Sequence, residues 1–182
     1  MRITWHLLAA SLGLGCAVAT ANADGLLVSR ATFAGGVENR EPAPAIPAGE
    51  GAGAGPLWFW SEIQALPETL ERLREEHRLP LQHRWYKNVA GIPGPDQRAD
   101  FYRYLEEIDA PTIAGLTREA DARGFFTYRT SSCRSFLRPG NWTVIVTDAK
   151  GARLSCLDGS SCRFDVTVHA GAGNADRCPP EP

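Results

Sequence analysis

The sequence predicts a mainly β protein, specifically an immunoglobulin-like antiparallel β-sandwich with a helical insertion, and three observations support this. The stretch 140–168 alternates apolar and polar residues, as strands with one buried face do. Turn residues such as Asp148 to Gly151 divide that stretch into three short strands. Four further segments of strand character, spread along the chain, bring the expected total to about seven, a number typical of such sandwiches.

The four further strands are expected at 26–34, 57–63, 81–90 and 125–131. In the second of these, Trp58, Trp60 and Glu62 lie on one face, opposite a face formed by Leu57, Phe59 and Ile63. Both faces are therefore largely apolar. One explanation is a central strand, covered by the other sheet on one side and by helices on the other. The alternative is an exposed aromatic platform that binds a sugar ring or a protein.

Two regions of helical character interrupt the strands. A helix is expected at about 67–79, because Pro67 suits the first helical position and Pro80 stops a helix. The segment of about 94–124 reads as a helical insertion of two helices, opened by Pro95 and Pro111 and closed by Gly124. We expect these helices to pack on a sheet face or edge.

Residues 1–23 have the features of a secretory signal peptide. They combine Arg2, an apolar run over 7–18 and the small residues Ala21-Asn22-Ala23 before Asp24. Attachment of a lipid at Cys16 is the alternative interpretation of this segment. Residues 24–182 are then a single domain with a flexible loop at 43–56, rich in Pro, Ala and Gly, and a C-terminal tail at 170–182. A periplasmic or secreted location follows from this interpretation.

Four cysteines follow the predicted cleavage site, and an even number behind a signal peptide indicates two disulfides. They are Cys133, Cys156, Cys162 and Cys178. Three pairings are possible. We favour Cys156 with Cys162, which clips a turn between strands, and Cys133 with Cys178, which ties down the tail. A zinc site is the competing interpretation, but thiolate ligands usually have a tighter Cys-x-x-Cys spacing.

Charge and hydropathy set limits on the partners. The chain carries 19 basic and 21 acidic residues and a formal net charge of −2, without the basic stripe that binding to nucleic acid requires. We therefore expect no nucleic-acid partner. No segment after the signal peptide reaches the roughly 20 apolar residues that a membrane-spanning helix needs.

The sequence contains no motif that identifies a catalytic, metal or cofactor site. It has no His-Glu-x-x-His, no Gly-x-Ser-x-Gly and no Gly-rich loop that follows a strand and opens a helix. We expect no metal, no cofactor and no catalytic residue. His83 is best explained as a packed strand histidine. The enzymatic alternative is a cell-wall or polysaccharide hydrolase that uses Glu62 and His83 on neighbouring strands.

Several local patterns resemble the bacterial domain-of-unknown-function 2914 family over most of residues 26–155. The resemblance rests on five pieces in the same order, which are Arg30-Ala31-Thr32-Phe33 with 36–42, Trp58-Phe59-Trp60-Ser61-Glu62, His83-Arg84-Trp85-Tyr86, Tyr128-Arg129-Thr130-Ser131-Ser132, and Gly140-Asn141-Trp142-Thr143-Val144 with its turn at 148–151. The resemblance implies a small envelope-associated β domain without established activity. Segment 91–124, longer and more helical than the family pattern, and the four cysteines depart from it.

The sequence therefore favours a non-catalytic interaction module that binds an envelope protein or a glycan. Trp58 and Trp60 are the first candidate contact residues, because aromatic side chains are the one enrichment in the chain that suits recognition. Arg40 and Glu41 are the second choice, since they stand in a polar turn that the family pattern shares.

Overall fold

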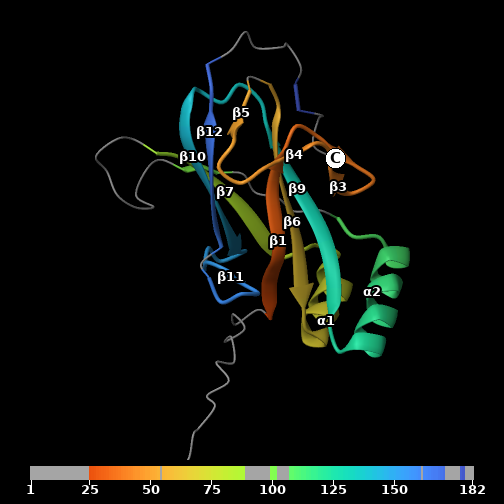
Figure 1. Cartoon of the computed structure of the whole chain (residues 1–182). Helices are drawn as coiled ribbons and strands as arrows, with labels where there is room; N and C mark the ends of the chain where they lie inside the picture. The colour runs from red at the N-terminus through yellow and green to blue at the C-terminus, as the bar shows by residue number, and fades with distance from the viewer. Residues whose placement is uncertain are drawn as a thin grey trace, which may run out of the picture.

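A computed structural model describes residues 25–53, 55–88, 99–101, 107–160, 162–170 and 177–178, with the side chains of 99–101 left aside. The predicted signal peptide, including Cys16, lies outside the described residues, as does most of the predicted tail. Within the described part the protein is mainly β, as the sequence predicts, and it has two helices. Its strands form two five-stranded sheets and one small hairpin, and the sheets include a curled half-barrel (Figure 1).

The first sheet has the strand order β11-β1-β6-β9, and a short strand, β4, also pairs with β1. The long strands pair antiparallel, whereas β11 runs parallel to β1. This sheet carries the candidate site on its outer face. Its strands are β1 (Leu26–Ala34), β4 (Ala45–Ile46), β6 (Leu57–Ala65), β9 (Phe126–Arg134) and β11 (Ser155–Cys156).

The second sheet has the order β5-β12-β10-β7-β8, and all its pairs are antiparallel except that of β5 with β12. A hairpin of two short strands, β2 (Val37–Glu38) and β3 (Glu41–Pro42), lies in the sequence between β1 and β4 of the first sheet. The strands of the second sheet are β5 (Gly51–Ala52), β7 (Leu81–Lys87), β8 (Ala99–Phe101), β10 (Gly140–Asp148) and β12 (Arg163–Val168).

The inner faces of the two sheets meet in an aromatic core. Phe59 of β6 lies at its centre, with its ring centroid 5.3 Å from that of Phe33, 5.2 Å from Phe164 and 6.4 Å from Trp85. The four rings come from β1, β6, β7 and β12, so each sheet contributes two. Phe59 and Trp85 are fully buried. The period-2 alternation of the strands thus places their apolar residues between the sheets, as the sequence predicts.

Both helices are bounded by local sequence signals. Helix α1 (Pro67–Glu76) begins with proline and ends before His77, whose left-handed φ of 52° lets its N–H bond to Leu73 O at 2.8 Å. Helix α2 (Ala110–Arg123) is capped by Asp109, which accepts a 2.8 Å hydrogen bond from the Thr112 N–H. The two helices contact each other, and α2 contacts β9, so they pack at one edge of the first sheet (Figure 1).

Two sequence predictions need correction. Residues 99–101 fall within the helix expected after Pro95, yet they form β8, which pairs with β7. Strand pairing outweighs the local helical spacing there. Glu107, near the end of the expected helix, also forms a β-bridge, with Arg78, while residues 95–98 and 102–106 lie outside the described residues. The segment expected as a loop at 43–56 carries β4 and β5, which pair with β1 and β12. A segment rich in Pro, Ala and Gly can still form short strands, because strand pairing uses backbone hydrogen bonds and needs no apolar side chains.

The two disulfides have the pairing that the sequence analysis favours. Cys133 is bonded to Cys178 and Cys156 to Cys162, with Cα atoms 5.7 and 5.2 Å apart. Two disulfides indicate an oxidising, extracytoplasmic environment. Neither helix in the described part of the chain has the length and apolar character that crossing a bilayer requires.

Candidate functional site

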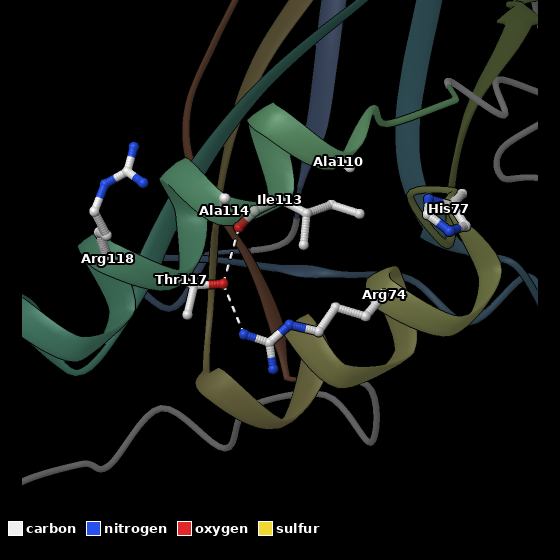
Figure 2. A pocket seen from close by; sticks show the side chains of 7 residues that line it. All are labelled: Arg74, His77, Ala110, Ile113, Ala114, Thr117 and Arg118. Atoms are coloured by element: carbon white, nitrogen blue, oxygen red, sulfur yellow. Dashed lines mark hydrogen bonds between the residues drawn. The ribbon is translucent and has the colours of Figure 1, made fainter.

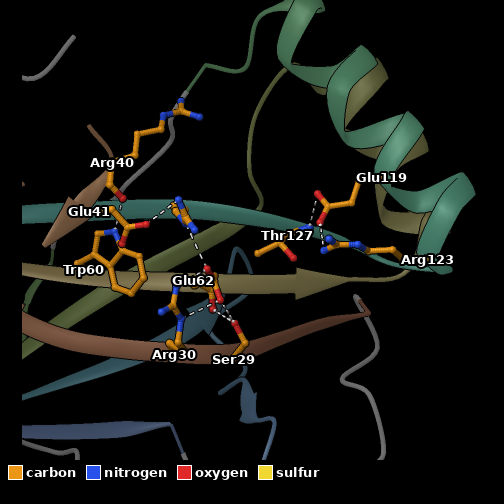
Figure 3. A network of polar contacts seen from close by, with 10 residues as sticks. Ser29, Arg30, Arg40, Glu41, Trp60, Glu62, Glu119, Arg123 and Thr127 are labelled. Carbon is orange, nitrogen blue, oxygen red and sulfur yellow. Dashed lines mark hydrogen bonds and ion pairs between the residues drawn. The ribbon is translucent and has the colours of Figure 1, made fainter. Parts of the chain in front are cut away.

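The register of the first sheet gathers the predicted contact residues on its outer face. In the pairing of β6 with its neighbours, Glu62 stands opposite Arg30 on β1 and Arg129 on β9. Trp60 and Trp58 lie on the same face of β6, two and four residues before Glu62. The turn of the β2–β3 hairpin folds over this face and adds Arg40 and Glu41 (Figure 3). We call these seven residues the sheet-face cluster.

Glu62 is the centre of a network of charged hydrogen bonds. Its carboxylate accepts from Arg30 at 2.7 Å (Nη2 to Oε2) and 3.1 Å (Nε to Oε1), and from Arg129 Nε at 3.2 Å. Ser29 Oγ adds a fourth bond of 2.9 Å to Oε1. The bonds from Arg30 first, then those from Ser29 and Arg129, lower the pKa of Glu62 to about 2, against an opposing effect of burial. Glu62 is therefore held as a carboxylate.

The network continues to the hairpin. Glu41 forms a 2.7 Å ion pair with Nη1 of Arg129, so charges alternate along Arg30, Glu62, Arg129 and Glu41 (Figure 3). The side chain of Glu62 is only 10% exposed, whereas those of Arg30, Arg129 and Glu41 are 57%, 39% and 46% exposed. The outer three side chains are thus positioned by a buried carboxylate and still face solvent.

The two tryptophans have different surroundings. Trp60 is 3% exposed, its indole N–H donates a 2.8 Å hydrogen bond to Arg40 O, and the Arg30 guanidinium lies 5.3 Å from its ring centroid. Packing therefore explains Trp60, with the hairpin turn and Arg30 as its cover in place of the helices we expected. Trp58 is half-buried and is the more accessible of the two rings.

The hairpin turn has an unusual backbone. Asn39 and Arg40, its two central residues, have left-handed φ values of 50° and 62°, the conformation of a type I′ turn. Arginine rarely adopts this conformation, because its Cβ crowds the following carbonyl. The Arg40 side chain stabilises the turn by lying 5.2 Å over the ring of Tyr128 and by donating a 3.3 Å hydrogen bond to its hydroxyl. The turn is therefore anchored both to Trp60 and to the β9 edge.

His83 lies away from this cluster, in the core between the sheets. It is fully buried, with Nε2 3.0 Å from Ser61 Oγ and Nδ1 2.9 Å from Ser132 Oγ. Burial lowers the pKa of His83 to about 3, which keeps the imidazole neutral. Ser61 and Glu62 are adjacent on β6 and point to opposite faces. Glu62 and His83, the pair considered for a hydrolase, therefore do not converge.

A groove lies between the two helices. It has a volume of about 380 Å³ and an apolar wall of Ala110, Ile113 and Ala114. Arg74 crosses from α1 and donates a 2.7 Å hydrogen bond to Thr117 Oγ1 of α2, which closes one side (Figure 2). None of the contact residues predicted from the sequence lines this groove. Within the described residues, no group of three His, Cys, Asp or Glu side chains could hold a metal ion.

Sequence reasoning missed Arg30 and Arg129, which connect the other members of the sheet-face cluster. A signal for both was present. Each stands in one of the pieces that resemble the family pattern, and each occupies a strand position on the face that Glu62 shares. Their convergence depends on strand register, which alternation along a single strand does not give.

Comparisons with known proteins add no relative. No protein-family model, no curated protein and no solved structure matches the chain.

Proposed function

We propose that the protein is a non-catalytic interaction module, periplasmic or secreted, that binds an envelope protein or a glycan through the sheet-face cluster. One observation carries the proposal. Trp60 donates a hydrogen bond to Arg40 O, and Glu41 pairs with Arg129, which also binds Glu62, so Trp60, Arg40 and Glu41, three residues predicted from the sequence, lie together on one face. Trp58, the fourth selected residue, follows on the same face of β6.

The exposure of the cluster supports a binding role. Arg30, Arg129 and Glu41 present both donors and acceptors to solvent, and the buried Glu62 carboxylate restricts their freedom. Side chains that are already fixed lose little entropy when a partner binds. Arginine and tryptophan are also the residues that dominate binding energy in protein interfaces. A partner that offers a carboxylate, an amide or paired hydroxyls beside an apolar surface would complement this face.

A hydrolase is less well supported. A general acid needs a raised pKa and access to substrate, whereas Glu62 is ionised down to a pH of about 2 and His83 is fully buried. Glu62 points to the outer face of the first sheet, whereas His83, on β7 of the second sheet, lies in the core between the sheets.

The immunoglobulin-like classification and membership of the domain-of-unknown-function 2914 family belong to the same proposal. Two facing sheets that share an aromatic core support the first. The second rests on the five sequence pieces, three of which supply Arg30, Arg40, Glu41, Glu62 and Arg129 to the cluster.

Site-specific photo-crosslinking in intact cells tests the proposal. A photoreactive phenylalanine analogue at position 58 should give a discrete crosslinked product with an envelope component. The matched control is the same analogue at Glu76, which is exposed on α1. Equal labelling from both positions, or none from position 58, would remove the support for this face as the binding surface.

A further inference from the structure

The loop between β9 and β10 presents a bulky apolar side chain to solvent in a conformation that such residues rarely adopt. Phe136 is 72% exposed and has a φ of 59°. A non-glycine residue at positive φ is uncommon, and for a bulky side chain it is an outlier. Exposure of the ring and a disfavoured backbone at one position suggest that the ring is displayed for a function.

Several contacts hold this loop in place. The disulfide between Cys133 and Cys178 closes its first end, and Ser135 Oγ accepts a 2.7 Å hydrogen bond from the Cys178 N–H. At its other end, the Trp142 indole N–H donates a 2.9 Å hydrogen bond to Arg138 O. Between them Leu137 packs against the core. The backbone on each side of Phe136 is therefore fixed, and the ring projects from a rigid support.

The loop is positively charged. Arg138, two residues after Phe136, is exposed, whereas Arg134, the last residue of β9, is half-buried and its Nε is buried. No acidic residue occurs between Arg129 and Asp148. The chain as a whole has a net charge of −2, so this basic loop differs from the average surface. An apolar tip beside an exposed arginine complements an anionic surface that has an apolar layer beneath it.

We propose that the loop at 135–139, between β9 and β10, is a membrane-contacting element that inserts Phe136 at the headgroup–acyl boundary of an anionic lipid surface. Arg138 binds a lipid phosphate, for which the planar guanidinium is suited. The small area of the tip favours lipid over protein. A stable protein interface buries roughly 800 Å² on each partner, whereas one aromatic side chain supplies only about 150–250 Å².

Such contact is weak and reversible, and its effect is to orient the domain. The loop lies at the upper end of the fold in Figure 1, the end at which Trp58 pairs with Cys133. When the domain is held to the membrane by this tip, the outer face of the first sheet does not face the membrane. The inference does not depend on the proposed function, because none of the seven residues of the sheet-face cluster lies in this loop.

Flotation of the disulfide-bonded mature chain with lipid vesicles tests the inference. Vesicles containing about 30% phosphatidylglycerol in a zwitterionic lipid should carry the protein, and purely zwitterionic vesicles should carry much less. Phe136→Asn should reduce the partition coefficient about tenfold. Arg138→Gln should reduce it about fivefold, and only at low ionic strength. Asparagine tolerates a positive φ, so the first variant removes the ring without a folding penalty.

The control is Leu157→Asn, which removes another exposed apolar side chain, 50% exposed, from a loop next to β11. This variant should float like the wild type. Absence of wild-type flotation on anionic vesicles would overturn the inference and would favour a protein as the partner of the loop. Equal flotation of Phe136→Asn and the wild type would overturn it as well.

Discussion

Glu62 of β6 and Arg30 of β1 form a two-bonded pair across adjacent strands, with Arg30 Nη2 2.7 Å from Oε2 and Nε 3.1 Å from Oε1. A bidentate pair fixes the orientation of both planar groups. The same carboxylate also accepts a hydrogen bond from Arg129, which in turn pairs with Glu41. One buried carboxylate thereby joins β1, β6, β9 and the β2–β3 hairpin. The proposed binding face depends on this arrangement.

Removing the charge of Glu62 should destabilise the fold. A pKa near 2, against an ordinary value of 4.5, corresponds to about 3 kcal/mol of interaction with the ionised form. Glu62→Gln should lower the free energy of unfolding by an amount of that order, as measured by urea denaturation at neutral pH. Glu71→Gln is the matched control, because Glu71 pairs with Arg74 on the exposed face of α1. Its effect should stay below about 0.5 kcal/mol, and equal losses in both variants would contradict a special role for Glu62.

Acid should weaken the protein in two stages. The folded-state pKa of His83 is lowered to about 3, so between pH 6.5 and 3 the unfolded chain binds a proton that the folded protein does not. Stability therefore falls as the pH drops through this window, by about 1.4 kcal/mol per pH unit. The pKa of Glu62 is also lowered, and this carboxylate contributes to the loss only between about pH 4.5 and 2.

The two groups are separable by mutation. His83→Gln can still bond with Ser61 and Ser132 but does not titrate, so its stability should be nearly independent of pH between 6.5 and 4.5. Urea denaturation at several pH values measures this slope. A variant that keeps the wild-type slope in this window would show that His83 does not cause it.

The left-handed turn residue Arg40 can be tested by two truncations. Arg40→Ala and Arg40→Gly both remove the guanidinium contacts with Tyr128, and they differ in the backbone cost of a φ of 62°. Glycine adopts this conformation without a steric penalty, so Arg40→Gly should be about 1 kcal/mol more stable than Arg40→Ala. Thermal unfolding of the two variants measures the difference. The reverse order would mean that the turn has relaxed to another conformation.

The two disulfides should contribute unequally to stability. In the chain-entropy model, the bond between Cys133 and Cys178, 45 residues apart, contributes about 4 kcal/mol. The bond between Cys156 and Cys162, only 6 residues apart, contributes about 2 kcal/mol. Paired serine substitutions, compared by urea denaturation under non-reducing conditions, give the two losses. A larger loss at 156 and 162 would mean that native-state contacts outweigh the chain entropy.

Much of the fold could be predicted from the sequence because its strands are regular. Alternation along 57–63 places Phe59 inside and Trp60 outside, and the inner aromatic core follows from that pattern. The pairing of the four cysteines could also be predicted, because the short 156–162 interval spans a turn. Strand β8 was missed because the local spacing after Pro95 is helical, and such spacing carries no information on the pairing of 99–101 with β7.

The candidate site was predicted only in part. Trp58, Trp60, Arg40 and Glu41 were selected from composition and turn pattern, but what joins the last three is the register that sets Arg30 and Arg129 opposite Glu62. The burial of Trp60 was also beyond the sequence, because its cover comes from a hairpin turn twenty residues away. Long-range pairing in both cases decides which polar groups meet, and a local pattern does not specify it.

The central claim, that the outer face of the first sheet binds a partner, is tested most directly by comparative affinity capture with Trp58→Ser. Trp58 is half-buried and, unlike Trp60, has an accessible surface, so its replacement should leave the thermal midpoint within a few degrees of the wild type. Equal amounts of the two folded proteins are incubated with envelope extract, and the bound material is analysed by quantitative mass spectrometry and glycan analysis. We expect the wild type to retain a protein or glycan that Trp58→Ser does not. Identical bound material on both proteins would contradict it.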